Sequence, residues 1–336
     1  MKLFRLIFAG FMLLLGLTAC QTSDEMTYSA DPMDNIEALW QIIDTRYCYV
    51  EDRNVNWDTV HATYLEKAAA LPKNDAVAMF DLCAEMLNLL EDGHVNLYSP
   101  FDRSYSTAWY DSYPANFSSY LQQKYLHDYR IAGGLYYCTI GDSIGYVYYS
   151  SFSTAISAGN ISWVLRSFKD CKGLIIDVRN NGGGSMEYAY LLSSPFFMDD
   201  RIIGYWQHKT GPGHQDFSEM EELRSNASLC GVKWQRPVVV LSNRRSYSAT
   251  NMFINIMRYA DHAVVIGGKS GGGGGMPLSY EIPCGWMVRF SSVRMYDAEK
   301  KDIEQGIEPD IPVNLTSSDK DDIIEKAIEV INGWSL

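Results

Sequence analysis

Hydrophobic side chains follow two different periods along the chain, one typical of helices and one typical of buried strands. Between residues 34 and 91, apolar residues recur every three or four positions, as at Ile36, Leu39, Trp40 and Ile43. This spacing places their side chains on one face of a helix, where they can be buried together. We therefore expect a small helical domain near the N-terminus.

Short apolar runs that alternate with helical segments dominate the chain after residue 134. The runs GLIIDV, RPVVVLS and AVVIGG are apolar almost throughout, and segments such as SAGNISWVLRSFKD and MEYAYLLSS have helical spacing. Such alternation is typical of βαβ units, in which a parallel sheet is covered on both faces. The pattern predicts an α/β core with a parallel-rich sheet and helices.

The remaining segments have less regular patterns. The part of the chain before the core is rich in Tyr and Ser without a clear period, and residues 201–232 look like an insertion of uncertain structure. The expected order is a signal peptide over residues 1–20, a flexible tether over 21–33, a helical domain over 34–100, a connection over 101–134, the α/β core over 135–316 and a C-terminal helix over 317–336.

The first twenty residues, MKLFRLIFAGFMLLLGLTAC, combine a basic start, an apolar run and small residues before Cys20. The apolar run is short for a membrane span and fits a secretory signal. Its ending, LTAC, resembles the bacterial lipobox, which implies that Cys20 becomes the lipidated first residue of the mature protein. Several acyl chains would hold the protein on a membrane. An ordinary secretory signal or a single membrane anchor remains the alternative.

Composition and charge narrow the class of protein. Hydrophobic residues form 47% of the chain and charged residues 21%, which is typical of a globular protein. The formal net charge of −13 argues against nucleic acid as a partner, because phosphate binding requires a basic surface. The six cysteines after Cys20 match no metal-binding spacing, so we expect no metal site. An exported protein permits disulfides, whose pairing the sequence does not give.

The glycine-rich segment VVIGGKSGGGGGMP invites comparison with a phosphate-binding loop. The Gly-Lys-Ser end of the Walker pattern is present, but Ala263 stands where its first glycine is required. The five successive glycines that follow cost conformational entropy on folding, and glycine is useful where another backbone passes closely. We expect a groove, along which a peptide could run, at Gly271, Gly272 and Gly273.

A second glycine-rich loop follows the apolar strand GLII, in the segment DVRNNGGGS. A strand that ends in such a loop and leads into a helix presents free backbone N–H groups, which favour an anion. The alternative is a plain tight turn, which rarely needs three glycines.

Two serines lie between a strand and a helix in RPVVVLSNRRSYSATNMFINIMRYA. Ser246 and Ser248 follow the break at Asn-Arg-Arg, and a serine before a helix is most often an N-cap. Their position alone leaves open whether either of them is a nucleophile.

His94 is the histidine with the most suggestive surroundings. It follows a glycine and two carboxylates in EDGHVNL, just past the end of an expected helix. A lone histidine is usually structural, but its ordinary pKa suits a general base near neutral pH.

Six segments together resemble the C-terminal processing peptidase family, which includes tail-specific proteases and the core of the tricorn protease. They are LLEDGHVNL, IGYVYYSSF, KGLIIDVRNNGGGS, PVVVLSNRRSYSATN, VVIGGKSGGGGG and IEQGIEPDIPV, in the family's order. The resemblance covers about residues 34–315. It implies a ClpP/crotonase-like α/β core and a serine peptidase activity without a cofactor or metal.

The family's nucleophile is the central serine of a Ser-Ala-Ser-Ala-Ser-Glu-like turn. On the turn SYSATN of this chain, the resemblance points to Ser248, with Ser246 as the runner-up. The family's oxyanion hole uses the amide after the nucleophile and a glycine of the Asn-Asn-x-Gly-Gly loop. These positions correspond to Ala249 and Gly183, with Gly182 adjacent.

The general base separates two branches of the family. The tail-specific branch uses a lysine, but Gly273 stands at that position and the nearest lysine, Lys269, falls four residues early. The tricorn-like branch uses a histidine and a glutamate, which implies a triad of Ser248, His94 and Glu304. Glu308 and Asp92 are alternative carboxylates.

The resemblance therefore implies a lipid-anchored serine endopeptidase of the bacterial outer membrane or cell envelope, facing the periplasm or the cell surface. It would cleave peptides or unfolded protein segments through an acyl-enzyme. The stretch between His94 and the core is too short for the PDZ domain of many relatives, so we expect none. A catalytically inactive peptide-binding lipoprotein is the main alternative, and a hydrolase of non-peptide esters or amides is a third.

Overall fold

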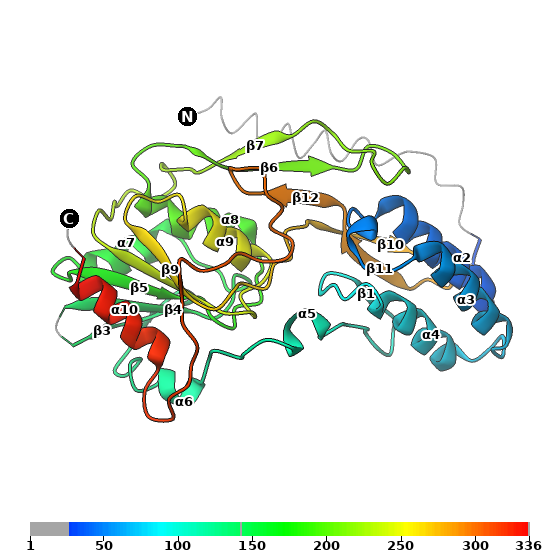
Figure 1. Cartoon of the computed structure of the whole chain (residues 1–336), viewed down its shortest axis with the longest axis horizontal. Helices are drawn as coiled ribbons and strands as arrows, with labels where there is room; N and C mark the ends of the chain where they lie inside the picture. Colours follow the sequence, from blue (N-terminus) through cyan, green and yellow to red (C-terminus); the bar gives the residue numbers. More distant parts are fainter. Residues whose placement is uncertain (1–26, 142, 335–336) are drawn as a thin grey trace.

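The computed structural model describes residues 27–141 and 143–334 of the 336-residue chain. The expected signal peptide, Cys20 and much of the expected tether lie outside the described residues. Figure 1 shows two regions side by side, a group of N-terminal helices with a small sheet and a larger sheet with helices around it. Among the described helices, none is both long and apolar enough to cross a membrane.

Three helices form the N-terminal region, where the apolar spacing predicts helices. Each begins after a residue whose side chain accepts a hydrogen bond from an amide of the first turn, which satisfies a donor that the helix leaves unpaired. The helices and their caps are α2 (Pro32–Arg46) after Asp31, α3 (Trp57–Ala69) after Asn56 and α4 (Ala76–Asn88) after Asp75.

These helices pack on a small antiparallel sheet with the order β1-β11-β10. Its strands are β1 (Asn96–Tyr98), β10 (Pro277–Glu281) and β11 (Met287–Ser291). Val288 and Phe290 of β11 are fully buried in the same core as Ile36 and Leu39 of α2. The N-terminal region is therefore completed by strands from far downstream in the sequence, beyond the expected boundary at residue 100.

A seven-stranded sheet forms the α/β core, with the order β13-β9-β8-β5-β4-β3-β2. The strands from β13 to β4 are parallel, and β2, β3 and β4 pair antiparallel at one edge. The expected parallel-rich α/β core is confirmed. The strands are β2 (Arg130–Ala132), β3 (Leu135–Ile140), β4 (Ile144–Tyr149), β5 (Gly173–Asp177), β8 (Val238–Ser242), β9 (Ala263–Gly267) and β13 (Ile311–Pro312).

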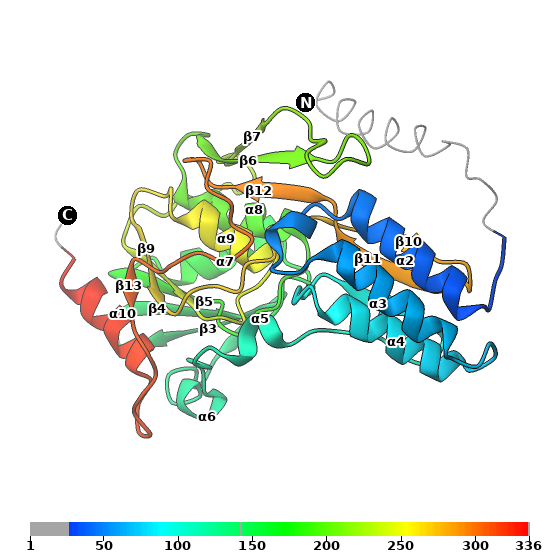
Figure 2. The ribbon, with the colours of Figure 1, turned by 45° about the vertical axis from the view of Figure 1, so that its right-hand side comes forward.

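Helices cover both faces of this sheet, as Figures 1 and 2 show. Leu174 and Ile176 of β5 join the core formed with α7, α8 and α9, whereas Ile175 between them joins the core formed with α10. Because successive side chains of a strand point to opposite faces, a strand buried on both sides must be apolar throughout. The helices are α7 (Ala158–Ser167), α8 (Met186–Ser193), α9 (Ala249–Met257) and α10 (Asp322–Asn332).

The expected insertion over residues 201–232 contains two strands of a third sheet, which has the order β12-β6-β7. These strands are β6 (Ile202–His208), β7 (Glu221–Arg224) and β12 (Val293–Tyr296). A short 3₁₀ helix, η2 (Ser194–Phe196), joins α8 to this region. Because β12 follows β11 after one residue, one stretch of chain links the small sheet to this third sheet.

The expected connection over residues 101–134 carries two one-turn helices, α5 (Ala108–Asp111) and α6 (Ser119–Gln122). It runs from β1 past the junction of the two regions to the edge of the large sheet (Figure 1). Arg244 fastens it to the turn after β8: its Nε donates to the carbonyl of Trp109 at 2.6 Å, and its guanidinium lies 4.1 Å from the ring centre of Tyr113. The connection is therefore attached to the core beside Ser248.

Candidate active site

Ser248 lies where β8 gives way to α9, in the N-cap position of that helix. Its backbone has φ 60° and ψ −121°, a conformation that is uncommon for a residue other than glycine. The side chain makes no capping hydrogen bond, and its Oγ instead lies 3.0 Å from Nε2 of His94. A strained turn that presents a serine hydroxyl to an imidazole is typical of a nucleophile.

Ser246, the runner-up, has a structural role in the same turn. Its Oγ donates to the carbonyl of Val178 at 2.8 Å and accepts from the amide of Asn243 at 3.1 Å. Its side chain is fully buried. These contacts join the turn to the end of β5, and they leave Ser248 as the serine that faces a base.

His94 lies in the loop between α4 and β1, and several contacts hold it there. Its amide donates to Oδ1 of Asp92 at 2.7 Å, and its ring packs against Tyr247 with the ring centres 4.8 Å apart. The second ring nitrogen, Nδ1, lies 3.3 Å from Oγ of Ser291 at the end of β11. The structure therefore brings His94 and Ser248 together, although they come from different regions of the fold.

The environment of His94 favours the neutral imidazole. Burial lowers its pKa to about 4, an effect that the nearby charge of Asp92 opposes and that Arg289 and Arg53 reinforce. At neutral pH the ring is therefore unprotonated and able to accept the proton of Ser248. That is the state that a general base requires.

Glu304 was expected to orient the ring of His94, but the structure does not join the two side chains. Its Oε1 is 2.7 Å from Nη2 of Arg53, and its Oε2 accepts the amide of Gly274 at 2.8 Å. No hydrogen bond links Glu304 to His94 among the described residues, and Ser291 occupies the place beside Nδ1. The backbone carbonyl of Glu304 accepts the amide of Gly273, so the segment around Glu304 lies against the glycine run. The carboxylate of Glu304 therefore contacts this run and not His94.

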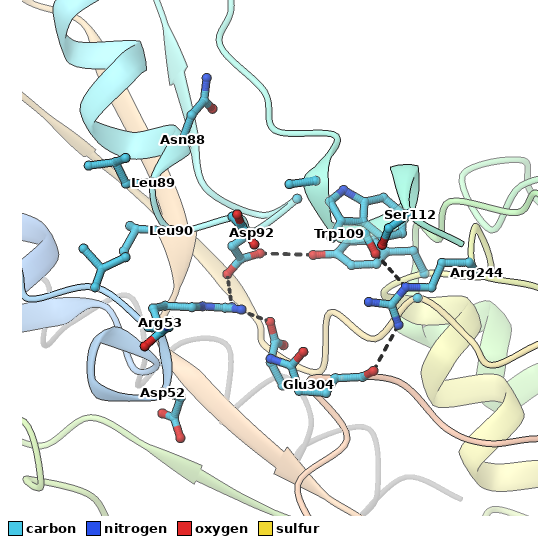
Figure 3. A pocket seen from close by; sticks show the side chains of 18 of the residues that line it. Asp52, Arg53, Asn88, Leu89, Leu90, Asp92, Trp109, Ser112, Arg244 and Glu304 are labelled. Atoms are coloured by element: carbon cyan, nitrogen blue, oxygen red, sulfur yellow. Dashed lines mark hydrogen bonds and ion pairs between the residues drawn. The ribbon is translucent and has the colours of Figure 1, made fainter. Parts of the chain in front are cut away.

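Arg53 holds two buried carboxylates at once. It follows the 3₁₀ helix η1 (Val50–Asp52), and its Nη2 lies 2.8 Å from Asp92 and 2.7 Å from Glu304. Figure 3 shows Arg53 between these two side chains. Burial and the charge of Asp92 raise the pKa of Glu304 to about 8, whereas Arg53 opposes this shift. Although burial acts against it, Arg53 also holds the pKa of Asp92 below its ordinary value.

The amide expected after the nucleophile is available for an oxyanion. Ala249 is the first residue of α9, and its N–H donates to no other described residue. It lies at a helix N-terminus, where partial positive charge favours an anion. This free amide is therefore available as one donor of an oxyanion hole.

The glycine loop reaches the nucleophile as expected, but its donor is already used. Gly183 has φ 96°, and a Cβ placed there would lie 2.8 Å from Cβ of Ser248, so only glycine fits against the serine. However, the amide of Gly183 donates to Oδ1 of Asn181 at 3.0 Å. Gly182 beside it is exposed, with open space around its Cα. A second oxyanion donor from Gly183 requires this internal hydrogen bond to open.

The glycine run from residue 271 to 275 is buried, and the backbones that pass closely belong to the protein itself. The carbonyl of Gly272 accepts the amide of Ser248 at 2.8 Å, and the amide of Gly273 donates to the carbonyl of Glu304 at 3.1 Å. Gly272 and Gly273 therefore do not form the expected substrate groove. Glycine is required because the run is enclosed between the nucleophile turn and the segment at Glu304, where a side chain would collide with this chain's own backbone.

A cavity of about 580 Å³ lies next to the candidate catalytic residues, although neither Ser248 nor His94 lines it. Gly93 and Tyr247, their neighbours in sequence, form part of its wall, together with Gly271. Figure 3 shows Arg244 and Trp109 across the cavity from Arg53. The ring of Tyr247 separates the cavity from His94, because it packs against the imidazole on one side and against Trp109, 4.2 Å away, on the other.

The other candidate residues take structural roles. Lys269 forms an ion pair with Glu308 at 3.1 Å, so neither supplies a base or an orienting carboxylate to His94. The described part of the chain contains no group of metal-ligating side chains. The six cysteines after the N-terminal segment are all free thiols.

Sequence reasoning missed several residues that shape the site. Tyr247 donates its hydroxyl to Asp92 at 3.1 Å, and Asn181 holds the glycine loop. Ser291 lies in a segment whose pattern indicates only a strand, and Arg53 lies in the stretch expected to be helical. Of these residues, Asn181 had the clearest signal, because it belongs to the Asn-Asn-Gly-Gly-Gly motif.

Two protein-family models match parts of this chain. The model of peptidase family S41 matches residues 143–313, and that of the tricorn protease C1 domain matches residues 28–88. The crystal structure of a putative peptidase from Parabacteroides merdae is 44% identical, with a TM-score of 0.83, and the match covers 90% of this chain and 96% of that one.

More distant relatives share the core or the fold. The carboxy-terminal processing protease CtpA of Bacillus subtilis is 27% identical over 52% of this chain, and the carboxy-terminal processing protease CtpB of the same species is 26% identical over the same share. These matches span 36% and 34% of the relatives, about a third of their length. Mature CPAF, at 12% identity and a TM-score of 0.70, covers 91% of this chain and 98% of its own, and shows the shared fold alone.

The matched region contains the glycine loop, the nucleophile turn and the buried glycine run, and it covers slightly more than half of the chain. The chain therefore belongs to peptidase family S41, a family of serine-type peptidases.

Proposed function

We propose that the protein is a serine endopeptidase that cleaves peptides or unfolded protein segments through an acyl-enzyme. The observation that carries the proposal is the 3.0 Å contact between Oγ of Ser248 and Nε2 of a buried, neutral His94. A catalytically inactive protein that only binds peptides would not require a serine in a strained conformation and in hydrogen-bonding contact with a base. The inactive peptide-binding alternative is therefore less well supported.

In the proposed mechanism, His94 takes the proton of Ser248 as Oγ attacks the scissile carbonyl. The developing oxyanion accepts a hydrogen bond from the amide of Ala249, and from Gly183 once its bond to Asn181 opens. Each such donor lowers the barrier by about 3 kcal/mol. Protonated His94 then gives its proton to the leaving amine, and water hydrolyses the acyl-enzyme with His94 again as base.

Labelling with a fluorophosphonate probe tests the nucleophile directly. We expect the purified full chain to be labelled on Ser248, as located by peptide mapping. The Ser248→Ala and His94→Ala variants should lose labelling, because one lacks the nucleophile and the other lacks its base. Ser246→Ala is the matched control in the same turn, and its folded fraction should still be labelled.

Three results would contradict the proposal. Folded wild-type protein that is never labelled, and that cleaves no peptide in a panel of unfolded substrates, would favour the peptide-binding alternative. Labelling that survives His94→Ala would mean that another group is the base. Cleavage of esters but of no peptide would favour the hydrolase of non-peptide substrates.

We also propose that the protein acts in the bacterial outer membrane or elsewhere in the cell envelope, held by a lipid on Cys20 with its catalytic region facing the periplasm or the cell surface. The LTAC sequence supports this proposal. Cells grown with radiolabelled palmitate should incorporate label into the wild-type protein and not into a Cys20→Ala variant. Equal incorporation into both would exclude Cys20 as the lipidated residue.

A further inference from the structure

The imidazole of His94 has a partner on each ring nitrogen. Nε2 lies 3.0 Å from Oγ of Ser248, and Nδ1 lies 3.3 Å from Oγ of Ser291. A neutral imidazole carries one N–H proton. Nε2 can accept the hydroxyl proton of Ser248 only when the ring's own proton is on Nδ1. In the reactive form, Nδ1–H therefore donates to Ser291.

The two carboxylates nearest to this arrangement are occupied elsewhere. Asp92 accepts the backbone amide of His94 and the hydroxyl groups of Tyr47 and Tyr247, and it is paired with Arg53. Glu304 is bonded to Arg53 and to a glycine amide. Within the described ranges, neither carboxylate is hydrogen-bonded to the ring of His94.

Ser291 is held in place by its strand, by burial and by a backbone hydrogen bond. It is the last residue of β11 and is fully buried, and its carbonyl accepts the amide of Cys48 at 3.0 Å. A Cβ at Gly275 would overlap its side chain, so the absence of a side chain there makes room for the hydroxyl. Among the described residues, the hydroxyl of Ser291 has no hydrogen-bond partner other than His94.

We propose that Ser291 is the positioning residue of His94, in the place that a carboxylate occupies in a Ser-His-Asp triad. This inference rests on the proposed function. A neutral hydroxyl fixes the tautomer and the plane of the ring, as a carboxylate does, but adds no negative charge beside it. The buried carboxylate of Asp92 supplies the negative charge that offsets the imidazolium, from a greater distance.

Ser248, His94 and Ser291 account for every proton transfer of the proposed acylation step. The bond between Oγ of Ser248 and the scissile carbon forms as the Ser248 proton moves to Nε2 and the carbonyl electron pair moves to oxygen. Nδ1–H remains on the ring, donating to Ser291. The electron pair returns as the bond to the leaving nitrogen breaks, and that nitrogen takes the Nε2 proton.

Two variants of neighbouring serines test the role of Ser291 in the full chain. At pH 8, we expect Ser291→Ala to slow fluorophosphonate labelling of Ser248 by about 10- to 100-fold, because the base is no longer held in one tautomer. Ser292→Ala removes a hydroxyl from the next residue, which contacts the carbonyl of Met276 and not His94. Its labelling rate should stay within about twofold of wild type.

The tautomer of His94 distinguishes a positioning role of Ser291 from a purely structural one. If Ser291 only supported the fold, its removal would leave the ring proton on the same nitrogen. Nitrogen-15 NMR of protein labelled at histidine should place the proton of neutral His94 on Nδ1 in the wild type and in Ser292→Ala. In Ser291→Ala the proton should shift partly or wholly to Nε2, because Nδ1–H loses its acceptor while Ser248 can accept from Nε2.

The outcomes separate this inference from the proposed function. If folded wild-type protein is not labelled at all, the proposed function fails, and the NMR comparison still decides whether Ser291 sets the tautomer. If wild type is labelled and Ser291→Ala is labelled equally fast with an unchanged tautomer, Ser291 does not position His94 and the inference is overturned.

Discussion

Ser248 and His94 illustrate how much of the reactivity of a single side chain is set by its neighbours. The amide of Ser248 is held by Gly272, and a backbone with positive φ is kept in place by contacts on both sides of the turn. Such strain costs about 1–3 kcal/mol and persists only when the surrounding structure enforces it. The hydroxyl that results faces a neutral imidazole, and the first amide of α9, that of Ala249, donates to no other described residue.

The lowered pKa of His94 predicts an unusual acid limit for the reaction. A group with a folded-state pKa of about 4 is neutral above that pH, so the base is active well below the ordinary histidine value of 6.5. The second-order rate of fluorophosphonate labelling should therefore fall only as the pH approaches about 4. An acid limit near pH 6.5, in protein whose near-ultraviolet circular dichroism is unchanged, would contradict the buried state of the imidazole.

At this scale the sequence identifies residues that lie in recognisable local motifs. Ser248 and His94 could be predicted because each belongs to a short segment with its own pattern. Ser291 and Arg53 could not, since their roles arise only where β11 and η1 meet the site in three dimensions. Glu304 lies in the expected segment, but its side chain is drawn to Arg53 rather than to His94.

Among the elements, the nucleophile turn and the glycine run support each other. The amide of Gly271 donates to the carbonyl of Ser246, and the carbonyl of Gly272 accepts from Ser248, so the run acts as a short extra strand beside the turn. On its other side the run contacts the segment at Glu304. The geometry of the nucleophile thus depends on a segment without side chains.

Substitution within this run should be strongly destabilising. Gly272→Ala would place a Cβ on the carbonyl of Glu304, and the backbone φ of 82° at this position is itself unfavourable for alanine. We therefore expect the free energy of unfolding to fall by about 3 kcal/mol or more. Gly231→Ala, where a Cβ meets nothing within 4 Å, is the matched control and should change it by less than about 1 kcal/mol. Urea denaturation measures the free energy of unfolding of both variants. Equal decreases would contradict the close contact between Gly272 and the carbonyl of Glu304.

Strands and helices of the core were predictable because strict burial leaves a clear pattern. A strand such as β5, covered on both faces, must be apolar at every position, and the helices between such strands have one apolar face. The third sheet gave no such signal, because β7 is largely exposed and three of its four residues are charged. The segment GWMVRFSSVRMY, which contains β11, has strand character, but nothing local showed that it pairs with β1.

In the molecule as a whole, Arg53 connects the N-terminal region to the core. Its segment belongs to the N-terminal helices, whereas Glu304 lies in the chain that returns from β12 towards β13. The side chains of Arg53, Asp92 and Glu304 are 10%, 0% and 6% exposed, so solvent screens these ion pairs little. Removal of the cation would leave the two buried carboxylates without an opposite charge, although each keeps its other hydrogen bonds.

We expect Arg53→Met to reduce the free energy of unfolding by about 3–5 kcal/mol at pH 8, as for other broken buried ion pairs. The loss should be smaller at pH 5, because without the cation the pKa of each carboxylate rises and protonation removes the buried charge. Chemical denaturation at the two pH values measures this difference. Arg224→Met, in an exposed pair with Glu222, is the control and should cost less than about 1 kcal/mol. A loss that does not depend on pH would argue against uncompensated carboxylates.

The pairing of β1 with β11 also bears on when the protein becomes reactive during its synthesis. His94 is synthesised well before Ser291, at the end of β11, which follows it by 197 residues. Closing so long a loop is slow compared with forming local helices. We therefore expect a nascent chain to hold the candidate nucleophile and base apart until β11 has been made and can pair with β1.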